Sequence, residues 1–338
     1  MLQLNRLHIR LARAALRIPI PLAAAALCAT LVLAPGAAYA RRRHHAHPAP
    51  TARPSGPVLE SETQVLAYDV SIHRDDHGCG GAYFEIKRGY HLDYTSHPLC
   101  DAALRVGALA PDDPDERFLT PGNDLTGDGH PDLVVTGYSG GTNCCLTFYM
   151  FELEPKFRSL GKIQLRDDDH QSPHFVRLEP DRGVQIVVHD WTFARWHTGF
   201  ADSPAPLVIL EYRDGGWKVA RDLMREPPPS AETLQSKANN TRVDAMAANY
   251  DDPYRVWPDA KMPSELWANM LNLIYSGHPE LAWRFAELAW PARIRGKRRF
   301  LAEFRAQLAR SPYWNGIKEI AAIPSPTAMP TPSRSGGS

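Results

Sequence analysis

The sequence predicts an α+β fold: an antiparallel β-rich domain at residues 62–226, followed by a small helical subdomain at residues 227–323. Between residues 62 and 224, apolar and polar residues mostly alternate with a period of two, which is typical of half-buried strands. After the three prolines at 227–229 the period changes to 3.6, the period of an amphipathic helix. Of the 338 residues, about 265 lie between the two ends of unusual composition, enough for one large domain or two small ones.

The N-terminal residues 1–40 are predicted to be a cleaved signal peptide. Four arginines and no acid precede an apolar stretch at 18–34, and Ala-Tyr-Ala at 38–40 is a small-x-small cleavage site. The apolar stretch, about 17 residues with two prolines, is shorter than the roughly 20 residues that a membrane span needs. An uncleaved anchor is the alternative, favoured by the three arginines at 41–43. We expect an exported protein, periplasmic or secreted, with no stable membrane span after cleavage.

Charge and composition also define the ends of the mature chain. Cleavage removes four arginines and no acid, which lowers the 38 basic residues to 34 against 38 acidic ones, a net charge of −4. Without a basic stripe beyond residues 41–43, this balance argues against a nucleic-acid partner. Residues 41–61, basic and rich in His and Pro, form a predicted disordered linker. Residues 324–338, rich in Pro, Ser, Thr and Gly, form a predicted disordered tail.

The β-rich domain is predicted to contain a repeated unit. The strand candidates are 64–72, 82–87, 132–137, 146–153, 162–166, 184–189, 207–212 and 217–220. The segment 122–166 repeats in outline at 180–223: a polar turn, an apolar strand, a long connection, a second apolar strand and a short closing strand. A weaker first copy at 64–108 gives a unit of about 50 residues. Closed propellers contain about four to eight blades, so three units favour an open stack of small antiparallel sheets, or a sandwich of blade-like pieces.

Helix signals begin directly after the prolines at 227–229. Ser230 can cap a first helix. Ser264 is expected to cap a second helix, which Gly277 is expected to end. Two further helices are predicted, one from Pro279 to near Pro291 and one after Gly296, and the three later helices form a small unit of antiparallel hairpins.

The twelve residues at 124–135 read Asp-Leu-Thr-Gly-Asp-Gly-His-Pro-Asp-Leu-Val-Val and indicate a cation loop. The candidate ligands are the side chains of Asp124, Thr126, Asp128 and Asp132 and the carbonyl oxygen of His130. Such oxygen ligands suit a hard cation such as Ca²⁺. Gly127 and Gly129 permit the left-handed backbone that a tight wrap requires. A polar β-turn that binds no ion is the alternative.

This loop resembles the calcium loop of FG-GAP and VCBS-type repeats, which occur in integrin-α-like propellers and in exported bacterial proteins. The resemblance is specific over about a dozen residues and extends loosely to about fifty, through 140–153. An EF-hand fits less well because its twelfth position is a bidentate Glu, where this chain has Val135. The resemblance implies Ca²⁺ as the cofactor, with modest affinity because Thr126 replaces the more usual Asp or Asn. Residues 196–206 and 281–285 are similar to stretches of exported proteobacterial proteins, which implies an address and an architecture but no mechanism.

The mature chain would retain four cysteines, Cys79, Cys100, Cys144 and Cys145. An even number in an oxidising compartment indicates disulfides, and four cysteines allow three pairings. The pairing that we favour joins Cys79 to Cys100 and the adjacent Cys144 to Cys145. In the other two pairings each adjacent cysteine bonds to a distant partner. Adjacent strand residues point to opposite faces, so the adjacent bridge requires a distorted backbone, which the glycines at 140–141 permit.

Two further groups of residues are candidates for chemistry or binding. His189 and Asp190 end a predicted strand and could serve a hydrolase, although neither a Gly-x-Ser-x-Gly nor a His-Glu-x-x-His motif accompanies them. An aromatic group crowds the following connection, and it either forms a platform for a sugar or peptide or fills the core under a long loop. This aromatic group consists of Trp191, Phe193, Trp196, His197 and Phe200.

The sequence therefore favours an exported, calcium-stabilised β-rich binding or structural module with an unidentified protein or glycan partner. The alternative is a periplasmic or secreted hydrolase that uses His189 and Asp190. The two hypotheses differ in one structural requirement. An enzyme needs both residues to line a pocket together with a third polar group, whereas a binding module leaves them paired at the edge of a strand.

Overall fold

The structure is a computed structural model that describes residues 56–74, 81–97, 99–108, 114–141, 144–165, 174–179 and 182–318, without the side chains of residues 114–116, 141, 144 and 174. The predicted signal peptide, residues 41–55 of the predicted linker and the predicted C-terminal tail lie outside these residues. Residues 58–61 of the predicted linker belong to the first strand. Among the described helices, none combines the length and the apolar character needed to cross a membrane.

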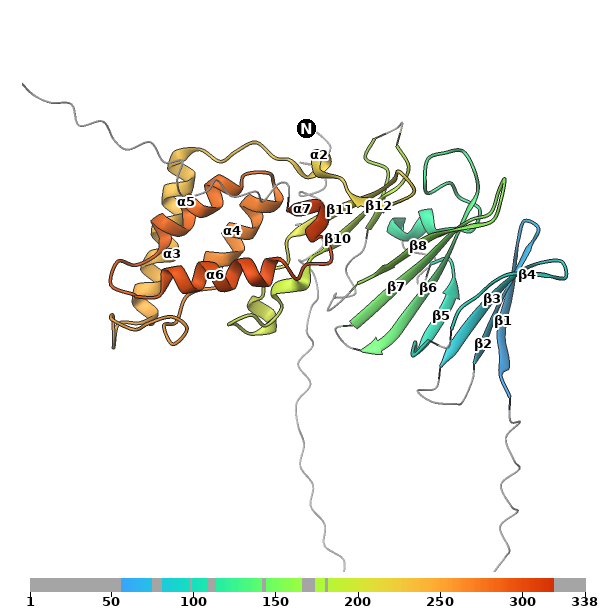
Figure 1. Cartoon of the computed structure of the whole chain (residues 1–338), viewed down its shortest axis with the longest axis horizontal. Coiled ribbons are helices and arrows are strands. Elements are labelled where there is room, and N and C mark those ends of the chain that lie inside the picture. The colour runs from blue at the N-terminus through green and yellow to red at the C-terminus, as the bar shows by residue number, and fades with distance from the viewer. Residues whose placement is uncertain are drawn as a thin grey trace, which may run out of the picture. The chain divides into compact units, whose positions relative to one another are not determined.

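Three four-stranded antiparallel sheets follow one another along the chain (Figure 1). Sheet A contains β1 (Val58–Val65), β2 (Tyr68–Arg74), β3 (Ala82–Arg88) and β4 (His91–Thr95). Sheet B contains β5 (Ala103–Val106), β6 (Asp132–Gly141), β7 (Cys144–Glu152) and β8 (Arg158–Gln164). Sheet C contains β9 (His174–Val176), β10 (Gln185–His189), β11 (Leu207–Arg213) and β12 (Gly216–Val219). In each sheet, neighbours in space are neighbours in sequence, so each sheet is one meander, as the repeated unit predicts.

The three sheets form an open stack with sheet B in the middle. One face of sheet B contributes Leu133, Val135 and Phe151 to a core shared with sheet A. The alternate residues of the same strands, among them Val134 and Met150, belong to a second core shared with sheet C. Because alternate strand residues point to opposite faces, sheet B is buried on both sides. The predicted α+β class and the predicted open stack of small antiparallel sheets are confirmed.

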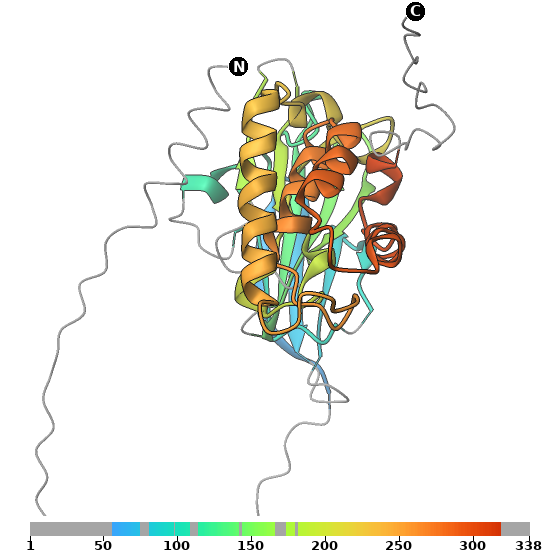
Figure 2. The same cartoon turned by 90° about the vertical axis from the view of Figure 1, so that its left-hand side faces the viewer.

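The helical region follows sheet C and packs into the same core as sheet C. Figure 2 shows this region facing the viewer, with the strands behind it. Its elements are α2 (Arg221–Met224), α3 (Ala231–Ala248), α4 (Glu265–Tyr275), α5 (Pro279–Ala289), α6 (Lys297–Leu308) and α7 (Trp314–Ile317). Three short 3-10 turns lie at Pro114–Leu119, Trp191–Phe193 and Phe200–Asp202.

The helix ends agree with most of the predicted signals. The Ser230 hydroxyl accepts a hydrogen bond from the Thr233 N–H at 3.1 Å, so the predicted cap of α3 is confirmed. Gly277 adopts a φ of +91° after α4, the left-handed conformation that ends a helix, and Pro279 occupies the first turn of α5. Ser264 differs, because it makes no side-chain capping hydrogen bond to α4.

Several strand boundaries differ from the prediction. The predicted strand at 64–72 is two strands, β1 and β2, joined by a turn at 66–67 in which Leu66 has a φ of +54°. The sequence pattern missed β4, β5 and β9 because these strands have five residues or fewer and show little alternation.

Candidate cation site

In the loop before β6, backbone N–H groups donate hydrogen bonds to the loop's own aspartate side chains. Gly127 and Gly129 have φ angles of +83° and +87°, the left-handed conformation predicted for them. The two carboxylate oxygens of Asp124 accept hydrogen bonds from the N–H groups of Gly127 at 2.6 Å and Gly129 at 2.9 Å. The Asp128 carboxylate accepts one from the His130 N–H at 3.0 Å. These hydrogen bonds fix the backbone of the loop in one conformation around its acidic side chains.

Asp132 is the first residue of β6 and is 1% exposed. Its Oδ2 atom accepts hydrogen bonds from the N–H groups of Leu125 at 2.8 Å and Thr126 at 3.1 Å. Its Oδ1 atom is buried and has no hydrogen-bond partner in the described part of the chain. A buried carboxylate oxygen without a partner is costly, so either a proton or a cation at Oδ1 would stabilise the folded protein.

Burial raises the pKa of Asp132 to about 7. The two backbone N–H groups that donate to Oδ2 lower this pKa, whereas the nearby charges of Asp128 and Asp124 raise it. At Asp128 burial also raises the pKa, but hydrogen bonds, foremost the one from the His130 N–H, outweigh it and leave the pKa below its usual value. The loop therefore holds one carboxylate that ionises readily and one that resists ionisation in the absence of a cation.

Glu152 is a fourth acid at this site, brought there by strand pairing across β6 and β7 and not by any spacing in the sequence. It lies directly opposite Asp132 in the antiparallel register of β6 and β7, and its side chain is 5% exposed. Arg158, the first residue of β8, pairs with the Glu152 carboxylate through both its Nε and its Nη2 atoms. The same guanidinium lies 3.7 Å from a carboxylate oxygen of Asp128. Asp132, Glu152 and Arg158 are thus cross-strand neighbours at one end of sheet B.

The acidic loop also forms the junction between sheets B and C. A Cβ atom on Gly127 would lie 2.5 Å from the backbone nitrogen of Gly183, so the two segments approach more closely than side chains permit. The Val184 N–H donates to the Leu125 carbonyl at 2.7 Å, and Arg177 donates to the Asp124 carbonyl at 3.2 Å. An ion held by the loop would therefore stabilise the contact between two sheets.

The side chains and carbonyl groups of the loop are oxygen ligands of the kind that hard cations prefer. The loop offers the carboxylates of Asp124, Asp128 and Asp132, the hydroxyl of Thr126 and the carbonyl of His130, all of them oxygen donors. They do not yet form a closed cage: among the described residues, no three His, Cys, Asp or Glu side chains are grouped closely enough to hold a metal ion. Binding would require the Asp128 carboxylate to turn from Arg158 towards Asp132.

His189 and Asp190 line a separate pocket of about 260 Å³ together with Gln164, Arg310 and Tyr313. The pocket with further polar groups that the hydrolase hypothesis requires is therefore present.

The Asp190 carboxylate, however, is 2% exposed and already fully engaged. Its Oδ1 accepts from the N–H and the hydroxyl of Thr192, at 2.9 and 2.5 Å. Its Oδ2 accepts from the hydroxyls of Tyr275 at 2.6 Å and Ser311 at 2.5 Å. Burial first, and then the charge of Asp190, raise the pKa of Tyr275 well above its usual value, so this phenol stays protonated as a donor. These contacts make Asp190 a cross-link between the end of β10 and the helical region.

The predicted aromatic group divides between core and surface. Phe193 is 1% exposed, and its ring lies 5.1 Å from that of Phe304 in α6. Trp196 packs edge-on against Trp267 of α4 at 5.4 Å. The residues on either side of Trp196, Arg195 and His197, have φ angles of +58° and +54°, so the backbone bends sharply to insert the indole.

The other members of this group make fewer ring contacts than Trp196. The rings of Trp191 and Phe200, half-buried like that of Trp196, stack on each other at 5.0 Å. The exposed His197 ring lies 4.5 Å from that of Trp257. The aromatic connection thus anchors the helices on sheet C and leaves four of its five rings partly exposed.

Of the predicted disulfide cysteines, the structure describes the side chains of Cys100 and Cys145, and both are disulfide-bonded. No disulfide joins two cysteines that both lie among the described side chains. Cys79 and the Cys144 side chain are outside them, so the pairing remains a prediction.

No protein-family model, no curated protein and no solved structure matches this chain. Any functional conclusion therefore depends on the geometry of the residues themselves.

Proposed function

We propose that this protein is an exported, calcium-stabilised β-rich module that binds a partner or supports an assembly. The observation that carries the proposal is the buried Oδ1 atom of Asp132, which has no hydrogen-bond partner in the described residues. Two further aspartates of the same loop act electrostatically on Asp132. A divalent cation would offset this repulsion and give the buried oxygen a ligand.

The position of the loop indicates what the ion would do. Because the loop is packed against Gly183 and Val184 of the next sheet, a bound ion would stabilise the B–C junction. We assign it no step in a reaction. The hydrolase hypothesis has less support, since the carboxylate of Asp190 is engaged by Thr192, Tyr275 and Ser311.

Thermal unfolding with and without Ca²⁺ tests the proposal. Extracellular-type calcium sites have dissociation constants of roughly 10⁻⁴ to 10⁻³ M. Millimolar Ca²⁺ should then stabilise the protein by about 0.4–1.4 kcal/mol, which raises Tm by about 1–5 °C for a domain of this size. Mg²⁺ should substitute poorly, because it demands a smaller octahedral site and releases its waters reluctantly.

Asp128→Ala should abolish the calcium-dependent increase in Tm, because it removes a central carboxylate of the loop. Asp244→Ala, at an exposed position of α3, is the matched control and should respond to Ca²⁺ as the unchanged protein does. If chelation leaves the Tm of protein purified with Ca²⁺ unchanged, and the purified protein contains no bound metal, the loop is a polar turn and the proposal is wrong.

A further inference from the structure

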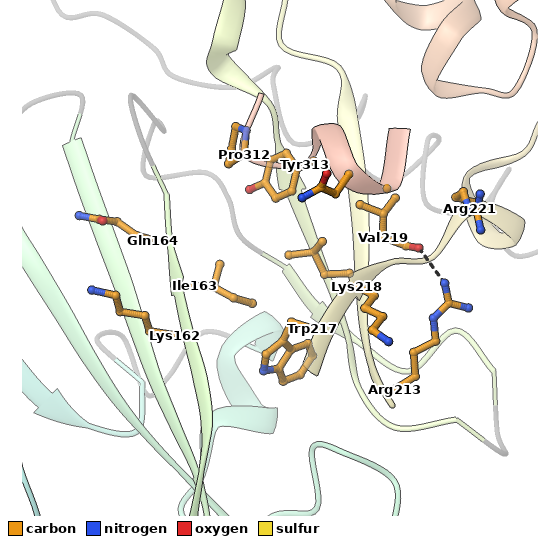
Figure 3. Close-up of a pocket in the computed structure, with 13 residues that line it drawn as sticks. Lys162, Ile163, Gln164, Arg213, Trp217, Lys218, Val219, Arg221, Pro312 and Tyr313 are labelled. Atoms are coloured by element: carbon orange, nitrogen blue, oxygen red, sulfur yellow. Dashed lines mark hydrogen bonds between the residues drawn. The ribbon is translucent and has the colours of Figure 1, made fainter. Parts of the chain in front are cut away.

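A second cavity of about 550 Å³ lies where sheets B and C meet the C-terminal helix α7 (Figure 3). Its walls come from β8, through Lys162 and Ile163, and from β11 and β12, through Arg213 and Trp217. Tyr313, just before α7, closes one side. The volume is within the range of about 300–1,000 Å³ that is typical of small-molecule sites.

The charged side chains that line this cavity are all positive. The lining includes four cationic side chains, Lys162, Arg213, Lys218 and Arg221, and no Asp or Glu. Acids compensate part of this charge from outside the lining: Glu211 pairs with Arg213 at 3.2 Å, and Asp214 pairs with Lys218 at 2.9 Å. Glu211 is shared, however, because Arg182 also pairs with it at 3.3 Å.

The basic character continues into an adjoining pocket of about 580 Å³, which shares Arg213 and Arg221 with the first. Arg182 and Arg225 add two cations there, against the acids Asp222 and Glu280. A concave surface of this kind concentrates anions, because the field of several cations adds up where low-dielectric walls exclude water.

Two buried donors in the cavity wall have no acceptor. The indole Nε1 of Trp217 and the Nε of Arg213 are buried and without a hydrogen-bond partner among the described residues. A buried N–H group that lacks an acceptor is destabilising. Because both atoms are closed to water, an oxygen-rich ligand would satisfy them only after the two side chains rotate towards the cavity.

The remaining wall is apolar and partly aromatic. Ile163, Leu210 and Val219 are buried residues that reach the cavity, and the half-buried ring of Trp217 lies beside them. An indole next to aliphatic side chains packs well against the C–H face of a sugar ring, and its N–H can bond to a sugar oxygen.

We propose that this cavity binds an acidic sugar, a saccharide that carries a carboxylate or a phosphate. The acidic group pairs with Lys162, Arg213 and Arg221, and the ring packs against Trp217. This inference specifies the binding role of the proposed module and uses none of the residues of the acidic loop, so it does not require a bound cation.

Isothermal titration calorimetry at low ionic strength tests the proposal, with glucuronate, glucose 6-phosphate, glucose and inorganic phosphate as probes. We expect at least one of the two acidic sugars to bind more tightly than both glucose and inorganic phosphate. The carboxylate and phosphate probes distinguish the two sources of charge. The titrations are run with Ca²⁺ and with chelator, so that failure of the calcium proposal is seen separately from failure of sugar binding.

Lys162 is the best position for a variant, because it is an exposed cation in the lining. Lys162→Glu should weaken binding of the acidic sugar by about tenfold or more, since an attractive charge pair becomes a repulsive one. Lys156→Glu is the matched control: Lys156 is exposed between β7 and β8 but outside the lining. It makes the same change in net charge and should leave affinity unchanged within about twofold, because exposed charges beyond about 10 Å are screened.

Trp217→Leu keeps an apolar wall but removes the indole, and it should abolish the preference for the acidic sugar over inorganic phosphate. A circular dichroism melt of each variant verifies that it is folded. Glucose binding as tight as that of both acidic sugars, failure of both acidic sugars to bind the unchanged protein, or equal weakening by Lys162→Glu and Lys156→Glu would overturn the assignment.

Discussion

Replacement of Asp132 by Asn tests whether the buried carboxylate is a cation ligand or a structural acceptor. The substitution keeps an oxygen that can accept from the N–H groups of Leu125 and Thr126. It removes the negative charge and places an amide near Asp124 and Asp128, whose charges act on Asp132. A purely structural acceptor would tolerate this change in any buffer, whereas a cation ligand would lose its response to Ca²⁺.

The free energy that the ionised Asp132 costs the cation-free protein follows from the shift of its pKa. Burial raises the pKa of Asp132 from 3.8 to about 7, a shift of about three units, which corresponds to about 4 kcal/mol. Relaxation of the folded protein reduces this figure, so we expect about 2 kcal/mol as the cost of the ionised carboxylate in the cation-free protein.

The direction in which stability changes with pH follows from the direction of the pKa shift of Asp132. Because the pKa in the folded state is the higher one, the folded protein binds more protons than the unfolded chain between pH 3.8 and about 7. The stability of the cation-free protein therefore falls as pH rises through this window, and the full cost is present above pH 7.

Thermal unfolding in chelator at pH 5 and pH 8 measures these effects. At pH 8 Asp132→Asn should be more stable than the unchanged protein by about 2 kcal/mol, or about 4–8 °C in Tm. At pH 5 the difference should fall to less than half, since Asp132 is then protonated in the folded protein, and it should vanish only near pH 3.8, where the unfolded chain takes up the proton as well. Millimolar Ca²⁺ at pH 8 should raise the Tm of the unchanged protein and leave that of the variant where it was.

Two results would refute this reasoning. A variant that is less stable than the unchanged protein in chelator at pH 8 would show that the carboxylate stabilises the fold without a cation. A variant that gains as much Tm from Ca²⁺ as the unchanged protein would place the ion elsewhere. Asp244→Asn, exposed on α3, controls for the general effect of removing one charge.

Three further predictions follow from the packing and from the cysteines. Asp190→Ala leaves two buried hydroxyl groups without their acceptor and should lower the free energy of unfolding by about 3 kcal/mol in urea titrations; Thr192→Val, which keeps the carboxylate, should cost clearly less. Trp196→Ala should cost about 3 kcal/mol because its half-buried indole packs against rings of α4 and α6 and its removal opens a cavity there, whereas Trp191→Ala, whose equally half-buried ring stacks on Phe200, should cost less than half of that in the same titration. Alkylation of the exported protein without reductant, followed by mass spectrometry, should modify none of the four mature cysteines, and labelling of the adjacent pair would contradict the disulfide prediction.

The architecture was predictable because its physical signal is repeated. Each sheet is a meander of four antiparallel strands that contains at least one strongly apolar strand, and the prolines at 227–229 mark the change to helices. The hairpin at Leu66 was missed because it lacks the Gly, Asn or Asp that usually accompanies a positive φ. The edge strand β4 was missed because its residues are exposed or half-buried and show no clear alternation.

The candidate site was predictable only as far as it is local in sequence. The spacing of Asp124, Asp128 and Asp132 and the left-handed glycines lie within one short loop. Glu152 joins them through the register of β6 and β7, a pairing that shifts between Tyr138 and Gly141 and that no spacing within the loop indicates. The close approach of Gly127 to Gly183 is a contact between two repeats, and no spacing within either repeat indicates it.

The roles of the aromatic residues follow from the open stack of three sheets. A stack of three sheets has two ends, and each end must be covered or polar. On sheet A the strand β3 alternates buried Phe84 and Ile86 with Glu85 and Lys87, so its outer face meets water through charged side chains. Sheet C has no such face: the core strand β10 is buried at four of its five positions. The helices cover this end, and Trp196, inserted by a strained turn, fills the space between them. Aromatic residues that look like a ligand platform in the sequence are therefore needed to close the stack, and the binding capacity of the molecule is better sought at the basic cavity between sheets B and C.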